Sequence, residues 1–257
     1  MKTAVFGAAG WLGRAVLANL AGRHEVRAFD FGPEAWEAWQ DVDGAWEGEK
    51  VYGDIANFGA VDQALEGVEG VIHTAVLGGG HPGAYGPEDP LPFQVDLQGL
   101  WNVLEAVRRW GIRRVVHVGS CQTVHPKGVF FTSQVRRPDA GLYGITKRLQ
   151  EEMCRQFHEG AGLSIIVLRP DYIVDSRLGM GWGWTREKLG EGGRRRANGW
   201  VCRHDLAEAC RLGLETRAVD FDIFHVVGTP EAEQTCNVSR SSQILGLVYR
   251  GDLERYR

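Results

Sequence analysis

Three evenly spaced glycines near the N-terminus constrain the fold of this chain more than any other feature of its sequence. Gly7, Gly10 and Gly13 follow a short apolar segment typical of a buried strand and open a segment with the apolar periodicity of a helix. Glycines at such a turn let backbone N–H groups approach a pyrophosphate, to which the helix N-terminus presents partial positive charge. The spacing is a variant of the dinucleotide fingerprint and predicts a cofactor site that also includes Trp11 and Leu12.

A carboxylate follows at the distance that such a site requires. Asp30 lies 17 positions past Gly13, at the end of the second predicted strand. There it can accept hydrogen bonds from both hydroxyls of an adenosine ribose, and it would repel a 2′-phosphate. Residues 31–33 offer no cation to that phosphate, so the sequence favours NAD over NADP. The alternative is a carboxylate that only stabilises a turn.

Short β-branched runs alternate with longer helix-like stretches along the chain, as in parallel sheets whose strands are joined by crossover helices. The core runs are almost continuously apolar, which is typical of strands covered on both faces. We therefore expect an α/β fold of the Rossmann type, a doubly wound parallel sheet. The predicted strands are residues 3–6, 25–30, 50–53, 70–74, 114–119, 163–168 and 222–227, and the predicted helices are residues 11–21, 60–65, 92–110, 143–158 and 206–215. The last of these helices is opened by Asp205 and Glu208, whose spacing resembles a capping box.

The 257 residues, 44% of them hydrophobic, are enough for one large domain with a lobe. We expect an NAD-binding domain over residues 1–169, and a small C-terminal substrate-binding lobe over residues 170–257 that is interleaved with the last sheet elements. Residues 77–89 and 171–200 break the strand and helix rhythm directly after the fourth and sixth strands. They are candidate substrate loops, with surface insertions as the alternative.

Composition narrows the class of partner. The formal net charge of −4, with acidic and basic residues interspersed, predicts neither nucleic-acid nor membrane binding and favours a small molecule. No apolar run approaches the roughly 20 residues of a membrane span, and no signal peptide is evident, so we expect a cytoplasmic protein. Five cysteines without a C-x-x-C pair, and histidines without ligand spacing, predict no disulfide framework and no metal site.

Three side chains form the candidate catalytic group. Tyr143 and Lys147 are four residues apart in a predicted helix, which places them on one face. An ammonium beside a phenol lowers the phenol pKa by favouring the phenolate, so the pair can act as a base. Ser120 ends the fifth predicted strand, at the sheet edge where its hydroxyl could hold a substrate oxygen.

Together these motifs resemble the extended short-chain dehydrogenase/reductases, the NAD-dependent epimerase/dehydratase family. The resemblance spans the first two thirds of the chain and also rests on residues 53–55, 71–75, 99–106 and 168–170. It implies further contacts to NAD, namely Asp54, Ile55, Ala75, Val76, Tyr143, Lys147 and Pro170. The first two would bracket the adenine, the next two would pass along the cofactor, and the proline would lie near the nicotinamide. Asp96 departs from the family, which commonly has Asn there to anchor a loop.

Within the family, residues 120–124, 136–139 and 200–206 look most similar to uronate dehydrogenases, although Cys121-Gln122 stands where those enzymes usually have Asn-His. Gln122 could hydrogen-bond a sugar hydroxyl. Arg177, which closely follows the sixth strand, could bind the carboxylate of an acidic sugar. The run at residues 194–196 is a further arginine cluster, and a solvated basic loop is the favoured interpretation of it.

These features predict an NAD-dependent dehydrogenase in which Tyr143 takes the proton of a substrate hydroxyl, Ser120 holds the oxygen and hydride passes to the nicotinamide. The short remainder of the chain after Arg169 favours a free sugar or sugar acid over a nucleotide sugar. A sugar epimerase that retains its NAD is the alternative. A catalytically silent NAD-sensing regulator is disfavoured, because such a protein needs no base. A dehydratase is disfavoured because Cys121-Gln122 replaces the Asp-Glu pair of those relatives.

The family commonly pairs through two helices, here residues 92–110 and 143–158. The resemblance therefore implies a homodimer. The apolar residues expected on these helices are Leu100, Val103, Leu104, Val107, Leu149 and Met153.

Overall fold

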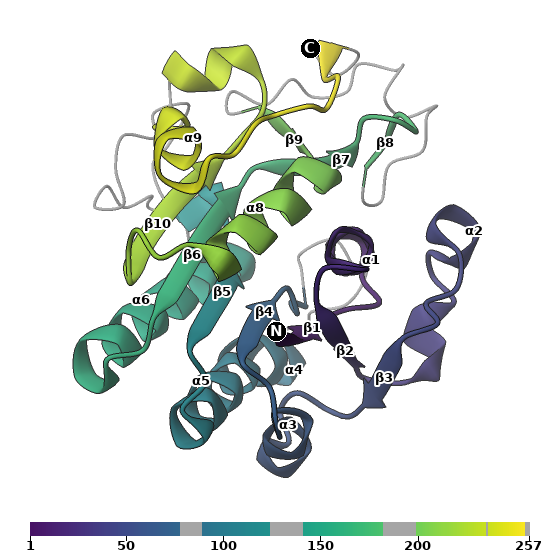
Figure 1. Cartoon of the computed structure of the whole chain (residues 1–257), viewed down its shortest axis with the longest axis vertical. Coiled ribbons are helices and arrows are strands. Elements are labelled where there is room, and N and C mark those ends of the chain that lie inside the picture. Colours follow the sequence, from purple (N-terminus) through teal and green to yellow (C-terminus); the bar gives the residue numbers. More distant parts are fainter. Residues whose placement is uncertain (78–88, 124–140, 182–198, 235, 255–257) are drawn as a thin grey trace.

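A seven-stranded parallel sheet forms the centre of the protein (Figure 1). The computed structural model describes residues 1–77, 89–123, 141–181, 199–234 and 236–254. The strands run in the order β10-β6-β5-β4-β1-β2-β3, and all their pairings are parallel. They are β1 (Lys2–Phe6), β2 (Glu25–Asp30), β3 (Glu49–Tyr52), β4 (Gly70–His73), β5 (Arg114–Val118), β6 (Ile165–Pro170) and β10 (Phe221–Val226). The order reverses between β1 and β4, where ligands bind in such sheets.

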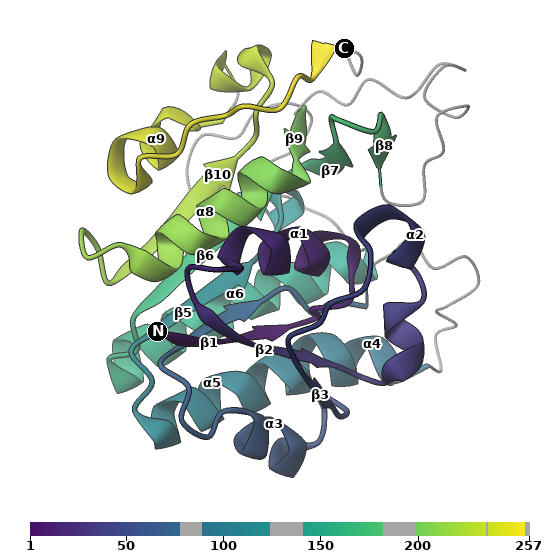
Figure 2. The same ribbon diagram turned by 45° about the vertical axis from the view of Figure 1, so that its right-hand side comes forward.

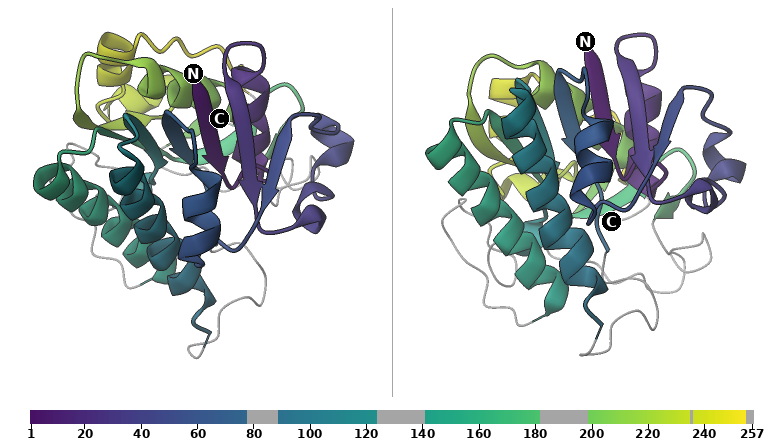
Figure 3. Two further views of the ribbon diagram at one scale, coloured as in Figure 1. Left: turned by 60° about the horizontal axis from the view of Figure 1, so that its bottom comes forward. Right: turned by 90° about the horizontal axis from the view of Figure 1, so that it is seen from below.

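Helices cover both faces of the sheet (Figures 2 and 3). Alternate strand residues point to opposite faces, so Val5 and Ile72 pack against one helix layer while Ala4 and Val71 pack against the other. The first layer holds α1 (Trp11–Leu20), α8 (Arg203–Glu215) and α9 (Ser239–Leu245), and the second holds α3 (Phe58–Ala64), α5 (Gly99–Trp110) and α6 (Leu142–Ala161). Both faces of the strands are therefore apolar, which confirms the predicted Rossmann-type doubly wound sheet.

All seven predicted strands are present, and their ends lie within two residues of the predicted ones. The predicted helix over residues 92–110 consists of three consecutive segments. These are α4 (Leu91–Phe93), a π-helical turn over Gln94–Gln98, and α5. The sequence did not reveal the short helices Pro33–Trp36 and α2 (Gln40–Asp43), which follow β2.

The predicted start of α8 was wrong. The spacing of Asp205 and Glu208 suggested a capping box at the start of a helix over residues 206–215, but α8 begins three residues earlier than predicted, at Arg203, and no side chain caps it. Its preceding strand runs directly into the helix. The Asp205 carboxylate instead accepts hydrogen bonds from the backbone N–H groups of Arg250 (3.0 Å) and Gly251 (2.9 Å), and so fixes the C-terminal segment.

A second, three-stranded sheet lies within the stretch that the sequence suggested was a loop. It consists of β7 (Tyr172–Asp175), β8 (Met180–Gly181) and β9 (Trp200–Cys202), with β7 in the middle. Residues 182–198 between β8 and β9 lie outside the described residues, as do the 194–196 arginine run and most of the candidate loop at 77–89. Among the helices that are described, none is long and apolar enough to cross a membrane.

Candidate active site

The glycine turn lies at the point where the strand order reverses. Gly7 has a φ of +77°, and a Cβ there would lie 2.6 Å from the Ala75 nitrogen. A Cβ at Gly13 would lie 2.1 Å from the Gly7 carbonyl oxygen, so neither position accepts a side chain. No side chain caps α1, whose first N–H groups remain available to an anion. The turn therefore fits a dinucleotide pyrophosphate.

Asp30 ends β2 beside this turn. One carboxylate oxygen accepts a hydrogen bond from the Ala9 N–H (2.8 Å), and the other accepts one from the Phe31 N–H (2.9 Å). Burial raises the Asp30 pKa, which these two donors and the nearby Arg14 lower. The carboxylate is thus held at the C-terminal end of β2 by backbone groups, with lone pairs left for ribose hydroxyls.

Arg14 is a buried cation close to Asp30, but its N–H groups are already used. It donates to the carbonyls of Trp36 (2.5 Å), Gly44 (2.8 Å) and Ala9 (3.4 Å), and its guanidinium lies 4.7 Å from the Trp36 ring centroid. These bonds hold the segment that follows β2 against α1. A 2′-phosphate would therefore meet the Asp30 carboxylate without gaining this guanidinium.

The remaining predicted cofactor residues surround the same edge. Thr74 donates to the Gly7 carbonyl (3.1 Å), which holds the start of the segment containing Ala75 and Val76 against the glycine turn. Asp54 accepts a hydrogen bond from the Ala56 N–H (2.8 Å) just after β3. The next residue, Ile55, is fixed through its carbonyl by Asn102 and packs under Gly99. Pro170 ends β6, which lies beside β5.

Ser120 and Tyr143 come from different elements and meet. Ser120 follows β5, and its hydroxyl accepts a hydrogen bond from the Gln122 N–H (3.1 Å). It also hydrogen-bonds the phenol of Tyr143, which belongs to the first turn of α6. Burial raises the pKa of Tyr143 to about 12, although the bond from Ser120 lowers it. Without a bound cofactor, Tyr143 is therefore a neutral phenol at physiological pH.

Lys147 lies one turn further along α6 and is 2% exposed. Its Nζ donates to the Val118 carbonyl at the end of β5 (2.9 Å) and lies 5.9 Å from the centroid of the Tyr143 ring. Burial lowers its pKa to about 8. The sequence led us to expect a depressed Tyr143 pKa, whereas in the structure burial raises it.

Sequence analysis missed an ion pair behind the Ser120 turn. Glu151, on α6, accepts bonds from Arg169 Nε (2.8 Å) and Nη2 (2.5 Å), and from the Thr123 hydroxyl (3.0 Å). Cys121 donates to the Arg169 carbonyl (3.3 Å), so both sides of the turn from Ser120 to Thr123 are tied to β6 and α6. The sequence did contain a signal for Glu151, because this residue is four positions past Lys147 and therefore lies on the same helix face.

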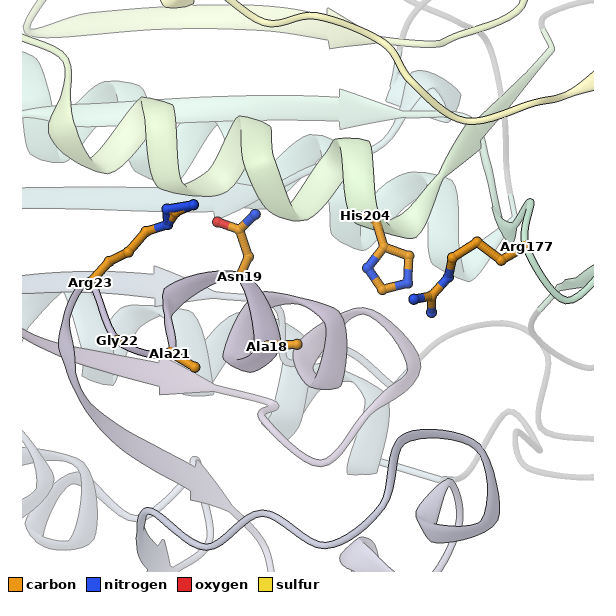
Figure 4. A pocket seen from close by; sticks show the side chains of 7 residues that line it. All are labelled: Ala18, Asn19, Ala21, Gly22, Arg23, Arg177 and His204. Atoms are coloured by element: carbon orange, nitrogen blue, oxygen red, sulfur yellow. The ribbon is translucent and has the colours of Figure 1, made fainter.

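Arg177 lies apart from these side chains. Its guanidinium makes two hydrogen bonds to Asp175 (2.9 and 3.1 Å), and it lines an open groove between α1 and α8 with Asn19, Arg23 and His204 (Figure 4). Asp175 is fully buried and also binds Arg203 (2.8 Å). The structure therefore brings together Ser120, Tyr143 and Lys147, and places Arg177 in an ion-pair network beside the outer face of α1.

Comparisons with known proteins show the family to which the chain is similar. Residues 3–174 match the model of the NAD dependent epimerase/dehydratase family. The chain is 27% identical over 258 residues to the uronate dehydrogenase of Pseudomonas putida, covering 98% of this chain and 84% of that protein. It is 33% identical over 170 residues to the uronate dehydrogenase of Agrobacterium fabrum, covering 64% and 58% of the two chains.

A solved structure shows the same fold. The UDP-glucuronic acid 4-epimerase of Bacillus cereus, in complex with NAD, superposes with a TM-score of 0.79 at 17% sequence identity, covering 98% of this chain and 95% of that one. The likeness extends over nearly the whole chain, including the second sheet and the C-terminal helices.

Proposed function

The chain belongs to the NAD-dependent epimerase/dehydratase family, and from that membership we propose that it oxidises a hydroxyl group of a sugar or sugar acid with NAD, in the manner of a uronate dehydrogenase. The observation that carries the proposal is the meeting of Ser120, Tyr143 and Lys147 at the C-terminal end of β5, on the edge of the sheet that holds the glycine turn. The proton acceptor Tyr143 and the glycine turn that fits the cofactor thus lie at the same edge of the sheet.

The chemistry follows from these side chains. Bound NAD supplies a positively charged nicotinamide that accepts hydride. Tyr143 takes the proton of the substrate hydroxyl, and Ser120 donates a hydrogen bond to the same oxygen. The Lys147 ammonium favours the phenolate form of Tyr143. We propose that Gln122, in the turn after Ser120, contacts the sugar.

A sugar epimerase that retains its NAD is the second candidate, because the same base and hydroxyl serve a transient oxidation. The two curated relatives favour net oxidation. The intact catalytic group argues against a silent NAD sensor.

The test is incubation with NAD and a panel of aldoses and uronates. We expect net NADH, read by its absorbance, with at least one sugar or uronate. Isomerisation of a sugar without net NADH would contradict the proposal and indicate an epimerase. NAD binding with neither reaction would indicate an NAD sensor.

We further propose that residues 1–169 bind NAD and that residues 170–257 supply the substrate lobe, working in the cytoplasm, where the five buried thiols stay reduced. Support for an interleaved lobe is that β10, late in the chain, pairs with β6 in the main sheet. A substrate contact from Arg177 stays a prediction.

We also propose a homodimer formed through α5 and α6. Four of the apolar residues expected at the interface, Leu100, Val103, Leu104 and Val107, are instead buried in the chain's own core. The large apolar residues of α5 and α6 that do face outward are Trp101 (51% exposed), Trp110 (46% exposed) and Leu149 (46% exposed). Light scattering should give twice the chain mass at micromolar concentration, and the double variant Trp101→Glu/Leu149→Glu should give the chain mass. A wild-type monomer would exclude the dimer.

Asp30 should set the preference for NAD. Asp30→Ser removes the carboxylate that faces the ribose, so NAD should bind more weakly and the preference for NAD over NADP should fall by about 10- to 100-fold, equivalent to roughly 1.5–3 kcal/mol for charge-assisted hydrogen bonds. Calorimetry with both cofactors measures the ratio. Glu34→Gln removes an exposed carboxylate four residues away and should change the ratio little. A wild-type protein that binds NADP as tightly as NAD would contradict the assignment.

A further inference from the structure

A buried carboxylate that the proposed chemistry does not use lies beneath the Tyr143–Lys147 pair. Asp96 belongs to the π-helical turn between α4 and α5 and is 1% exposed. One oxygen accepts a hydrogen bond from the Leu77 N–H (2.8 Å), and the other accepts one from the Thr146 hydroxyl (2.9 Å). Both donors are neutral, so neither neutralises the charge of the carboxylate.

The segment that carries Asp96 is locked onto α6. The Gln150 side chain donates to the Asp96 carbonyl (2.7 Å), one turn of α6 beyond Thr146. Asp96 therefore joins two parts of the site. One is the segment after β4, which is predicted to contact NAD, and the other is α6, the helix that carries Tyr143. The loop-anchoring bonds expected of an Asn at this position are made here by a residue that also carries charge.

The other titratable groups around Lys147 provide little negative charge to balance its ammonium. His73 on β4 and His117 on β5 touch through their Nδ1 atoms (3.2 Å), and burial lowers both pKa values, so both rings are neutral. Burial raises the pKa of the Cys154 thiol, which is neutral as well. Glu151 is already paired with Arg169.

We propose that Asp96 is a positioning residue that supplies the counter-charge to Lys147 and keeps its side chain an ammonium next to Tyr143. Burial alone disfavours a charged lysine, and a carboxylate without a guanidinium partner offsets that cost. Among the groups that raise the Lys147 pKa against burial, Asp96 has the largest effect. Among those that lower the Asp96 pKa, Lys147 has the largest effect.

Asp96→Asn is close to a pure charge deletion. An amide oxygen can still accept from the Leu77 N–H, and the amide N–H can donate to the Thr146 hydroxyl. That hydroxyl already lies 3.2 Å from the Tyr143 carbonyl, to which it can donate instead. The packing and the loop anchor are thus retained while the charge is lost.

The lysine itself gives the decisive readout. The chain has only five lysines, so the pKa of Lys147 can be followed by NMR in protein with ¹³C-labelled lysine side chains and assigned by comparison with Lys147→Met. In Asp96→Asn the pKa of Lys147 should fall by about one unit or more, as expected for loss of the opposite charge that raises it most. Thr146→Val, which removes a hydrogen bond to Asp96 but no charge, should leave it within a few tenths of a unit.

An unchanged Lys147 pKa in Asp96→Asn would overturn the proposal and leave Asp96 a loop anchor only. If that variant does not fold, the reciprocal experiment decides. Lys147→Met should then raise the pKa of the Asp96 carboxyl, and no rise would count against the pairing. Neither titration needs turnover, so a failure here is distinct from a failure to find a sugar substrate.

The catalytic consequence rests on the proposed function. Asp96 raises the pKa of Lys147 and, more weakly, that of Tyr143, so Asp96→Asn should move both limbs of the kcat profile to lower pH. The alkaline limb, where Lys147 loses its proton, should move further. A merely structural defect would lower kcat at every pH without moving the limbs.

Discussion

Tyr143→Phe should lower kcat by about 10²- to 10⁴-fold, the typical contribution of general-base assistance, and leave NAD affinity nearly unchanged. The substitution removes only the hydroxyl, which hydrogen-bonds Ser120. The ring keeps its place in the first turn of α6, so the cofactor edge of the sheet is not disturbed. The loss should therefore appear in kcat and not in the dissociation constant of NAD.

A second buried tyrosine provides the control. Tyr249 hydrogen-bonds Ser241 (3.2 Å), and burial raises its pKa to about 12, as it does for Tyr143. Tyr249→Phe should therefore keep near wild-type kcat, with a loss of stability of about 1 kcal/mol from one buried hydrogen bond. Near wild-type kcat in Tyr143→Phe would show that this hydroxyl is not the base.

Lys147→Ala separates charge from proton transfer. Because Tyr143 has a pKa of about 12 before NAD binds, its phenolate depends on nearby positive charge. Loss of the ammonium should lower kcat, weaken the binding of NAD, and shift the remaining activity to higher pH. Stopped-flow turnover and NAD titrations between pH 6 and 10 measure all three.

Most of the sheet could be predicted because its determinants are local. Continuous apolar runs such as residues 165–168 are typical of strands covered on both faces, and the glycine spacing fixes the first turn. Ser120 could be placed because parallel strands end at one edge of the sheet, and the four-residue spacing put Tyr143 and Lys147 on one helix face. Arg177 is a different case, since its place after β6 suggested a substrate contact whereas its guanidinium pairs with Asp175.

The polar pairs behind the site could not be predicted from sequence patterns. Arg203 binds Asp43, 160 residues away, and nothing local to either residue indicates the other. The same holds for Asp205, whose acidic spacing suggested a helix cap until the C-terminal backbone was found on its carboxylate. Such contacts depend on how distant segments pack, which periodicity does not encode.

Arg203→Met should destabilise the protein by about 3–5 kcal/mol, the typical cost of removing one partner from a buried ion pair, which for a chain of this size lowers Tm by on the order of 10 °C. Arg203 is fully buried and donates to Asp43 (two bonds of 2.7 Å) and Asp175 (2.8 Å). Its guanidinium also lies 4.0 Å from the ring of Trp11, whose carbonyl it binds (3.2 Å). One side chain thus joins α8 and β7 to the first turn of α1 and the segment after β2.

Arg177→Met is the matched control, because it removes a different guanidinium from the same Asp175. The Arg177 side chain is 59% exposed, so its loss should cost about 1 kcal/mol or less. Arg203→Lys keeps the charge without the bidentate geometry and should fall between the two. Thermal and urea unfolding of the three variants measure the loss of stability in each and so give their order.

The pH dependence of the Arg203→Met defect separates lost charge pairing from lost packing. Hydrogen bonds from His204, Arg177 and Arg203 hold the Asp175 pKa well below its usual range although burial raises it, so in the wild type this pairing stabilises the fold at neutral pH and is lost as the pH falls. In Arg203→Met the Asp175 carboxylate loses one of these partners and protonates more readily. The stability gap between wild type and variant should therefore narrow below about pH 4, near the unperturbed aspartate pKa. A gap that stays constant from pH 7 down to about pH 2, well below the unperturbed aspartate pKa, would mean that the guanidinium acts through its packing on Trp11 and not through its charge.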